Sequence, residues 1–248
     1  MRVAVLSDIH GNAFALDAVL ADLSRGPVDR VVCLGDCVQG GPQPREVVER
    51  LRSLACPTVL GNADAWLLEG GRAGGENPSP EQEAVRQWQL TLLDAADRAF
   101  IAEFRPTIEL PLFGDAILLG FHGSPASYND IVWPATPRDE MTRILGSHPG
   151  RTLCGGHTHI QFVRRTGVHA HEFFFNPGSV GLVCDNESRD LHCESWAEYA
   201  LLTAEGGALS LEFRRVPFDL ERWLAILRDS GRPHLERALE AYQPRVAS

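Results

Sequence analysis

The stretch LCGGHTHIQF places two histidines, His157 and His159, one residue apart and directly after two glycines. In an extended segment, side chains two positions apart point to the same side, so both imidazoles can converge on one object. Other polar side chains of metal-ligand type also follow short apolar runs: Asp8, His10, Asp36, Asn62 and His122. Together, these carboxylates, imidazoles and one amide predict a site for divalent metal ions.

The number and type of these candidates indicate two ions. Mixed nitrogen and oxygen ligands suit Mn, Fe, Zn or Ni better than Mg or Ca, which favour oxygen alone. One catalytic metal takes about three or four protein ligands, whereas the chain offers more. Two ions about 3.5 to 4 Å apart, bridged by one aspartate, would accommodate all seven and leave positions for water. The two histidines of GGHTH would then serve different ions.

The segments that must position these residues alternate between predicted strands and helices. The apolar runs predict strands that end near Asp8, Asp36, Asn62, His122 and His157. Helices are predicted after the first strand, ending at Gly26-Pro27, and over 44–54. Parallel β/α units present functional residues just beyond the carboxyl ends of their strands, which is where the candidates stand.

The rest of the chain predicts an insert and a second sheet. A Gly/Pro-rich stretch, GGRAGGENPSPEQE, precedes one or two helices over 80–104, which could cap the site or cover a sheet edge. The later part of the chain is rich in predicted strands, and two helices follow from Asp219 and Pro233. We expect a second, more antiparallel sheet that packs on the first. We also expect one domain over 1–248, with a helical insert at about 66–105.

Composition excludes several classes of protein. All 23 basic residues are arginine, so the lysine of P-loop, Schiff-base and pyridoxal enzymes is missing. The net charge of -10 argues against a nucleic-acid-binding face. No apolar run suggests a signal peptide or a membrane span, so we expect a cytoplasmic protein.

The six cysteines contain no CxxC pair, and we expect them to be reduced. Cys33 and Cys37 flank Gly35 and Asp36, so a zinc or redox role stands beside the simpler interpretation of small buried side chains. A second HxH pair, His169 and His171, lacks the preceding glycines, and we expect a surface or packing role for it.

The motifs DIHGN, GD, GNAD, HG and GGHTH, in this order, resemble those of the calcineurin-like metallophosphoesterase superfamily. The insert after GNAD and the later NPGSVG (176–181) are similar to its small bacterial and archaeal phosphodiesterase branch, related to diadenosine-tetraphosphatase-like proteins. The resemblance spans about residues 1–181. It implies an α/β fold, a four-layer α/β/β/α sandwich of two mixed sheets, with a two-metal site between the sheets.

The resemblance also implies a role for each candidate residue. One metal would be held by Asp8, His10 and His159, the other by Asn62, His122 and His157, and Asp36 would bridge them. A hydroxide that bridges the ions would attack phosphorus. Asn12 would bind the substrate phosphate, although Asn is also a favoured helix N-cap. Arg164 could steer the phosphate or could simply be a solvated strand residue.

We therefore predict a metal-dependent phosphoric ester hydrolase that acts on small phosphodiester or nucleotide-type substrates. The alternatives are a phosphomonoesterase, a dinucleoside-polyphosphate hydrolase, or a non-catalytic metal-binding scaffold such as the retromer small subunit. Many relatives carry GNH, and their histidine is thought to help the leaving group. This chain has Ala63 at that position, whose side chain can neither protonate a leaving group nor bind phosphate. The enzyme should therefore prefer substrates with good leaving groups. The sequence predicts no oligomeric state.

Overall fold

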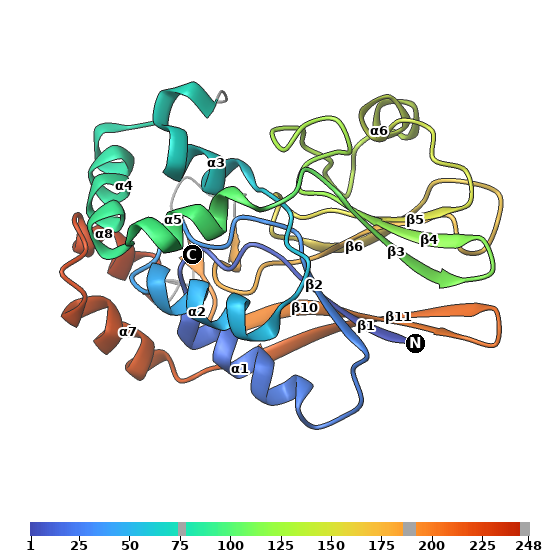
Figure 1. Ribbon diagram of the computed structural model, residues 1–248. Helices are drawn as coiled ribbons and strands as arrows, with labels where there is room; N and C mark the ends of the chain where they lie inside the picture. Colours follow the sequence, from blue (N-terminus) through green and yellow to red (C-terminus); the bar gives the residue numbers. More distant parts are fainter. Residues whose placement is uncertain (74–77, 186–191, 244–248) are drawn as a thin grey trace, which may run out of the picture.

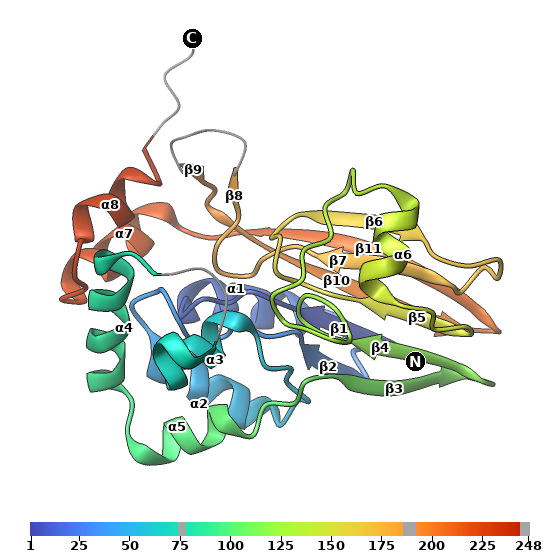
Figure 2. The same ribbon diagram turned by 90° about the horizontal axis from the view of Figure 1, so that it is seen from above.

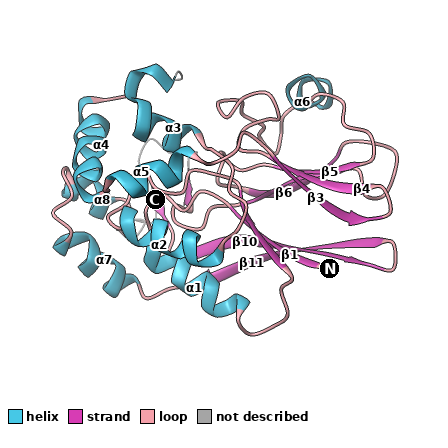
Figure 3. Cartoon of the chain, in the orientation of Figure 1, coloured by secondary structure: helices cyan, strands magenta, loops and turns pink. Residues whose placement is uncertain are grey.

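Two mixed β-sheets stacked face to face form the centre of the protein (Figure 1 and Figure 3). The structure is a computed structural model that describes residues 1–73, 78–185 and 192–243. The first sheet has the order β11-β10-β1-β2. Only β1 and β2 are parallel, while β10 is antiparallel to both of its neighbours. Its strands are β1 Arg2–Leu6, β2 Arg30–Cys33, β10 Trp196–Glu205 and β11 Ala208–Pro217.

The second sheet has the order β3-β4-β5-β7-β6. Its three inner strands are parallel, and the two edge strands run antiparallel to their neighbours. The strands are β3 Ile108–Phe113, β4 Ala116–Gly120, β5 Arg151–Cys154, β6 Gln161–Arg165 and β7 Phe173–Pro177. A separate pair consists of β8 Cys184–Asp185 and β9 His192–Cys193.

Helices cover the outer faces of both sheets. In β1, Val3 and Val5 belong to the apolar layer between the sheets, whereas Ala4 and Leu6 pack under α1 (Ala13–Leu23) and α2 (Pro44–Leu54). On the other side, α6 (Arg138–Leu145) packs on the second sheet. Figure 1 shows this order of layers from α1 to α6. The predicted four-layer α/β/β/α sandwich is confirmed.

The helical insert packs beside α2. It comprises α3 Asn62–Glu69, the 3-10 helix Gly70–Ala73, α4 Pro80–Leu92 and α5 Ala95–Ala102. Ser79 and Asp94 begin α4 and α5 with capping boxes. The C-terminal helices α7 (Leu220–Asp229) and α8 (Leu235–Glu240) lie next to α4 in both views (Figure 1 and Figure 2). Within the insert, α4 therefore forms a wall together with α7 and α8.

The sequence-based expectation for the later strands was wrong in one respect. β10 and β11 do not build the second sheet but extend the first, with Val3 opposite Leu202 and Val5 opposite Ala200. β10 is buried on both faces, so its apolar pattern fits an inner strand of either sheet. The strand predicted before Asn62 is reduced to isolated bridges at Thr58 and Val59.

The expectation that all six cysteines are reduced is also wrong. Cys184 and Cys193 lie opposite each other in the β8–β9 pair and form a disulfide, with their Cα atoms 4.0 Å apart. The sequence does not predict this disulfide, because the two cysteines meet only when two very short strands pair. Cys33 and Cys37 are fully buried free thiols, and burial raises the pKa of Cys37 well above its ordinary value. They pack in the core.

Among the described helices, none combines the length and the apolar character that a membrane span requires.

Candidate metal centre

The structure brings all seven predicted ligands together. They lie on the loops that follow β1, β2, β4 and β5 and at the start of α3. Two groups of three have their ligand atoms within 4.8 Å of one another: Asp8, His10 and His159, and Asp36, His122 and His157. The amide oxygen of Asn62 lies 2.9 Å from His122 Nε2 and so joins the second group.

In the first group, backbone carbonyls fix the orientation of two imidazoles. His10 Nδ1 lies 2.9 Å from the Gln39 carbonyl, and His159 Nδ1 lies 2.8 Å from the Leu182 carbonyl. A carbonyl only accepts, so each Nδ1 carries a proton and donates, and in the neutral ring Nε2 presents its lone pair. The two Nε2 atoms are only 3.1 Å apart. Two lone pairs at this distance repel unless a cation or a proton lies between them.

The second group is built in the same way. His122 Nδ1 donates to the Leu34 carbonyl at 2.9 Å, which leaves Nε2 for the centre of the group. That atom lies 3.2 Å from His157 Nδ1 and 3.2 Å from Asp36 Oδ2. Side-chain nitrogen and oxygen atoms of four residues thus converge on one point.

Asp36 connects the two groups. Its Oδ1 accepts a hydrogen bond from the Ala63 backbone N–H at 2.8 Å. Its Oδ2 lies 3.2 Å from His122 Nε2 and 3.8 Å from His10 Nε2. One oxygen of one carboxylate therefore faces both groups, as a bridging ligand would.

Asp8 supplies the clearest sign that the site suits a metal ion. Its side chain is fully buried, and Oδ2 accepts from the His157 backbone N–H at 3.1 Å. Its Oδ1 accepts no hydrogen bond from the described residues, although it lies 3.2 Å from His159 Nε2. A buried carboxylate oxygen without a donor is costly, and a cation would satisfy it. The residues present thus fit divalent ions with mixed nitrogen and oxygen ligands.

The electrostatics of the protein without metal lead to the same conclusion. Burial disfavours the charged form of His122, but the Asp36 carboxylate outweighs it and raises the pKa of His122 to about 10. Burial, followed by the positive charge of His122, lowers the pKa of His157 to about 4. Two buried carboxylates therefore favour positive charge at this point, which suits a cation.

The backbone around the site is strained. Seven described non-glycine residues have a positive φ, and five of them are candidate ligands: Asp8, His10, Asp36, His157 and His159. Such conformations cost free energy and cluster at functional sites. Two glycines make room for the ligands. A Cβ added to Gly61 would lie 2.0 Å from Asp36 Oδ1, and one added to Gly156 would lie 2.6 Å from Asp8 Oδ2.

Comparison with known proteins agrees with this geometry. A family model described as the calcineurin-like phosphoesterase superfamily domain matches residues 1–202. The chain belongs to this superfamily. The superfamily typically uses divalent metals, which gives the two groups their chemical context.

Individual relatives cover most of the chain. An uncharacterized protein of Methanocaldococcus jannaschii, MJ0912, is 29% identical over 203 residues, which span 77% of this chain and 81% of that protein. A metallophosphoesterase from Sphaerobacter thermophilus is 25% identical with a TM-score of 0.74, covering 97% of this chain and 99% of that one. The hypothetical protein PH1004 from Pyrococcus horikoshii OT3 shares the fold, with a TM-score of 0.78, 22% identity and 99% coverage of both chains.

The two predicted substrate contacts, Asn12 and Arg164, form hydrogen bonds within the chain. Asn12 caps α1 by accepting from the Ala15 N–H at 2.9 Å, and its amide donates to the Gly181 carbonyl at 3.0 Å. Arg164 donates to the carbonyls of Pro134 and Thr136 at 2.6 and 3.0 Å, and so it anchors the loop between β4 and α6. The structure shows a positioning role for both side chains.

Three residues that are not among the predicted ligands hold the ligand loops. The buried Asp64 accepts from the N–H groups of Cys37 and Val38 at 3.0 Å, directly after Asp36. Gln89 on α4 donates to the carbonyls of Val38 and Gly41 and accepts from Gly40 N–H. These contacts fix the loop whose Gln39 carbonyl orients the His10 ring.

The third of these residues is Asn176, in the NPGSVG turn. It is fully buried and donates to the Gly156 carbonyl at 2.6 Å and to Thr158 Oγ1 at 3.0 Å. It therefore holds the GGHTH loop in addition to shaping its own turn. The sequence signal was the turn motif itself, which does not reveal its partner.

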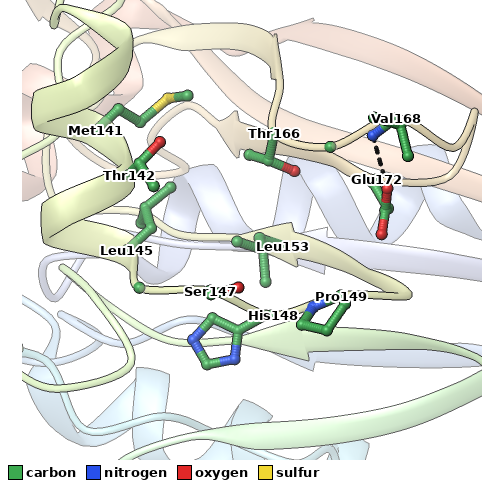
Figure 4. A pocket seen from close by; sticks show the side chains of 12 residues that line it. Met141, Thr142, Leu145, Ser147, His148, Pro149, Leu153, Thr166, Val168 and Glu172 are labelled. Carbon is green, nitrogen blue, oxygen red and sulfur yellow. Dashed lines mark hydrogen bonds between the residues drawn. The ribbon is translucent and has the colours of Figure 1, made fainter.

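A cavity separate from the metal centre is shown in Figure 4. Its volume is about 230 Å³, and it lies between α6 and the amino end of β5, whereas the ligands follow the carboxyl end of that strand. Its one carboxylate, Glu172, accepts hydrogen bonds from Gly150, Val168 and His169 N–H groups, which lower its pKa to about 2. The carboxylate is thus occupied with fixing a turn. Nearby, His169 and His171 stack on each other, which agrees with a packing role.

Proposed function

We propose that the protein is a two-metal phosphoesterase that hydrolyses small phosphodiester or nucleotide-type substrates. The observation that carries the proposal is the position of Asp36 Oδ2, which faces His122 on one side and His10 on the other. A single-metal site would need only one of the two groups. The strained backbone and the buried Asp8 Oδ1, which accepts no hydrogen bond from the described residues, support the same assignment.

Each group of ligands would hold one ion. Asp8, His10 and His159 would hold the first, Asn62, His122 and His157 the second, and Asp36 would bridge them. When bound, two such ions supply Lewis-acid charge and lower the pKa of a coordinated water from about 15.7 toward about 7. The carbonyls of Gln39, Leu182 and Leu34 would hold three rings with Nε2 toward the ions.

The chain offers no imidazole at the position of Ala63, where only its backbone N–H acts, by fixing Asp36. A general acid contributes about 10² to 10⁴-fold to rate. We therefore propose that the enzyme prefers leaving groups that depart without protonation, such as phenolates and nucleoside diphosphates. If Ala63→His left the ratio of activities on poor and good leaving groups unchanged, this part of the proposal would be wrong.

The test compares bis(p-nitrophenyl) phosphate with p-nitrophenyl phosphate as substrates for chelated and manganese-restored enzyme. We expect Mn²⁺ to restore hydrolysis of the diester and Asp36→Asn to abolish it. A higher rate on the monoester would indicate a phosphomonoesterase instead. Metal binding without turnover of either ester, or of a dinucleoside polyphosphate, would favour a non-catalytic scaffold.

A further inference from the structure

A larger cavity adjoins the metal centre at His10. Its volume is about 410 Å³, within the range of pockets that bind small organic molecules. Its walls come from the loop 39–41, from α4 and from α7 and α8, which lie together in Figure 2. The family model ends at residue 202, so α7 and α8 are parts of this chain that the shared domain does not define.

Arg232 places a positive charge in this cavity, close to the metal centre. Its Nε donates to the Gly40 carbonyl at 3.1 Å, next to Gln39, whose carbonyl accepts from His10. His10 and Arg232 line the same cavity, so the guanidinium and the first group of ligands face one space. Its Nη1 donates to the Pro233 carbonyl, whereas its Nη2 donates to no described residue.

The charges around Arg232 leave it without an anion. Within the described residues, no carboxylate forms an ion pair with it. The only carboxylate among the described residues that line the cavity, Glu81, is paired with Arg237. Burial, and then the positive charge of Arg237, lower the pKa of Arg232 below its ordinary value. In a chain with a net charge of -10, this surplus of positive charge requires an explanation.

Part of the cavity wall is apolar and aromatic. Trp223 is 3% exposed and meets Tyr242 edge to face, with ring centroids 6.3 Å apart. Val85 and Leu227 line the same space. A ligand that fits here combines an apolar or aromatic body with a group that accepts hydrogen bonds from a guanidinium, as phosphate does.

We propose that this cavity binds the organic part of the phosphoester substrate and that Arg232 binds a second phosphate carried by that part. The inference rests on the proposed function, because it places the scissile phosphate at the metal centre. Arg232 would be a specificity residue that distinguishes substrates with an additional phosphate from those without one.

The test uses two chromogenic diesters that differ by one phosphate: the p-nitrophenyl ester of thymidine 5′-phosphate, without and with a 3′-phosphate. We expect Arg232→Ala to raise KM for the 3′-phosphorylated ester at least about tenfold more than for the other ester. Arg232→Lys should restore part of this difference. Arg228→Ala, an exposed arginine on α7 that does not line the cavity, should keep the wild-type ratio of the two KM values.

A structural role for Arg232 would give a different result. In that case Arg232→Ala would change kcat or KM equally for both esters and would lower the melting temperature. Such an equal change would overturn the proposal. A wild-type enzyme that binds both esters with the same affinity would also overturn it. Hydrolysis of bis(p-nitrophenyl) phosphate by the wild type tests the proposed function separately. If that hydrolysis fails, calorimetric binding of thymidine 3′,5′-bisphosphate against thymidine 5′-phosphate still tests the cavity, and equal affinities would reject it.

Discussion

Gly61→Ala should disable the metal centre without removing any ligand. The new Cβ would lie 2.0 Å from Asp36 Oδ1 and 2.3 Å from the Asp36 backbone nitrogen, whereas real Cβ contacts essentially never fall below 3.0 Å. Asp36 or its neighbours must therefore move by about 1 Å. The hydrogen bond from Ala63 N–H to Asp36 Oδ1 would be lost or lengthened. A misplacement of about 1 Å can cost about 10²-fold in rate, and we expect kcat/KM to fall by about that factor.

The assay is manganese-dependent hydrolysis of bis(p-nitrophenyl) phosphate, with Mn²⁺ affinity measured by calorimetry on the same samples. Gly71→Ala is the matched control, because a Cβ at Gly71 meets nothing within 4 Å. Circular dichroism of the metal-free variants establishes that both are folded. Wild-type turnover and Mn²⁺ affinity in folded Gly61→Ala would refute the reasoning that Asp36 must occupy this position.

Three further predictions concern stability. Tyr199 and Arg214 donate to Asp22 and lower its pKa against the effect of burial, so the stability they confer is present above about pH 4 and is lost as pH falls through the folded pKa. Asp22→Asn should therefore lose about 1 to 2 kcal/mol at pH 7 in urea unfolding, and the loss should shrink as pH falls through the folded pKa. A difference independent of pH would contradict this. Gln89→Leu leaves buried backbone groups of the loop unpaired and should lower the free energy of unfolding by at least about 2 kcal/mol. The exposed Gln87→Leu should not lower it by this amount. Equal losses in the two variants would show that the loop contacts are dispensable. Mn²⁺ at about 100 times its Kd should stabilise the wild type by about 2.7 kcal/mol per site, and an equal shift of the melting temperature in Asp8→Asn would exclude Asp8 as a ligand.

The convergence of the candidate ligands was predictable because their chemistry is tied to local patterns. Each metal-ligand type of side chain follows a short apolar run, and strand ends are where α/β folds gather functional groups. His157 and His159 show the limit of this reasoning. The sequence predicts that both imidazoles converge, but the contacts to Leu182 and Asp8, and the positive φ of both residues, depend on distant parts of the chain.

Other features could not be predicted because equivalent patterns fit more than one arrangement. The apolar residues of β10 fit an inner strand of either sheet, and only pairing with β1 decides. Gln89 occupies a helix position that could equally face solvent, so the sequence does not predict its hydrogen bonds to the loop 38–41. Likewise, Arg232 lies nearly two hundred residues from Gly40 in sequence, and no spacing rule connects them. The sequence alone therefore does not predict the long-range hydrogen-bond partners of single polar residues.

The most direct test of the two-metal assignment is anomalous X-ray diffraction at the manganese edge from crystals grown with Mn²⁺. We predict two anomalous peaks about 3.5 to 4 Å apart, with Asp36 Oδ2 between them. One peak would contradict the bridging role of Asp36. Peaks away from both groups would contradict the site itself.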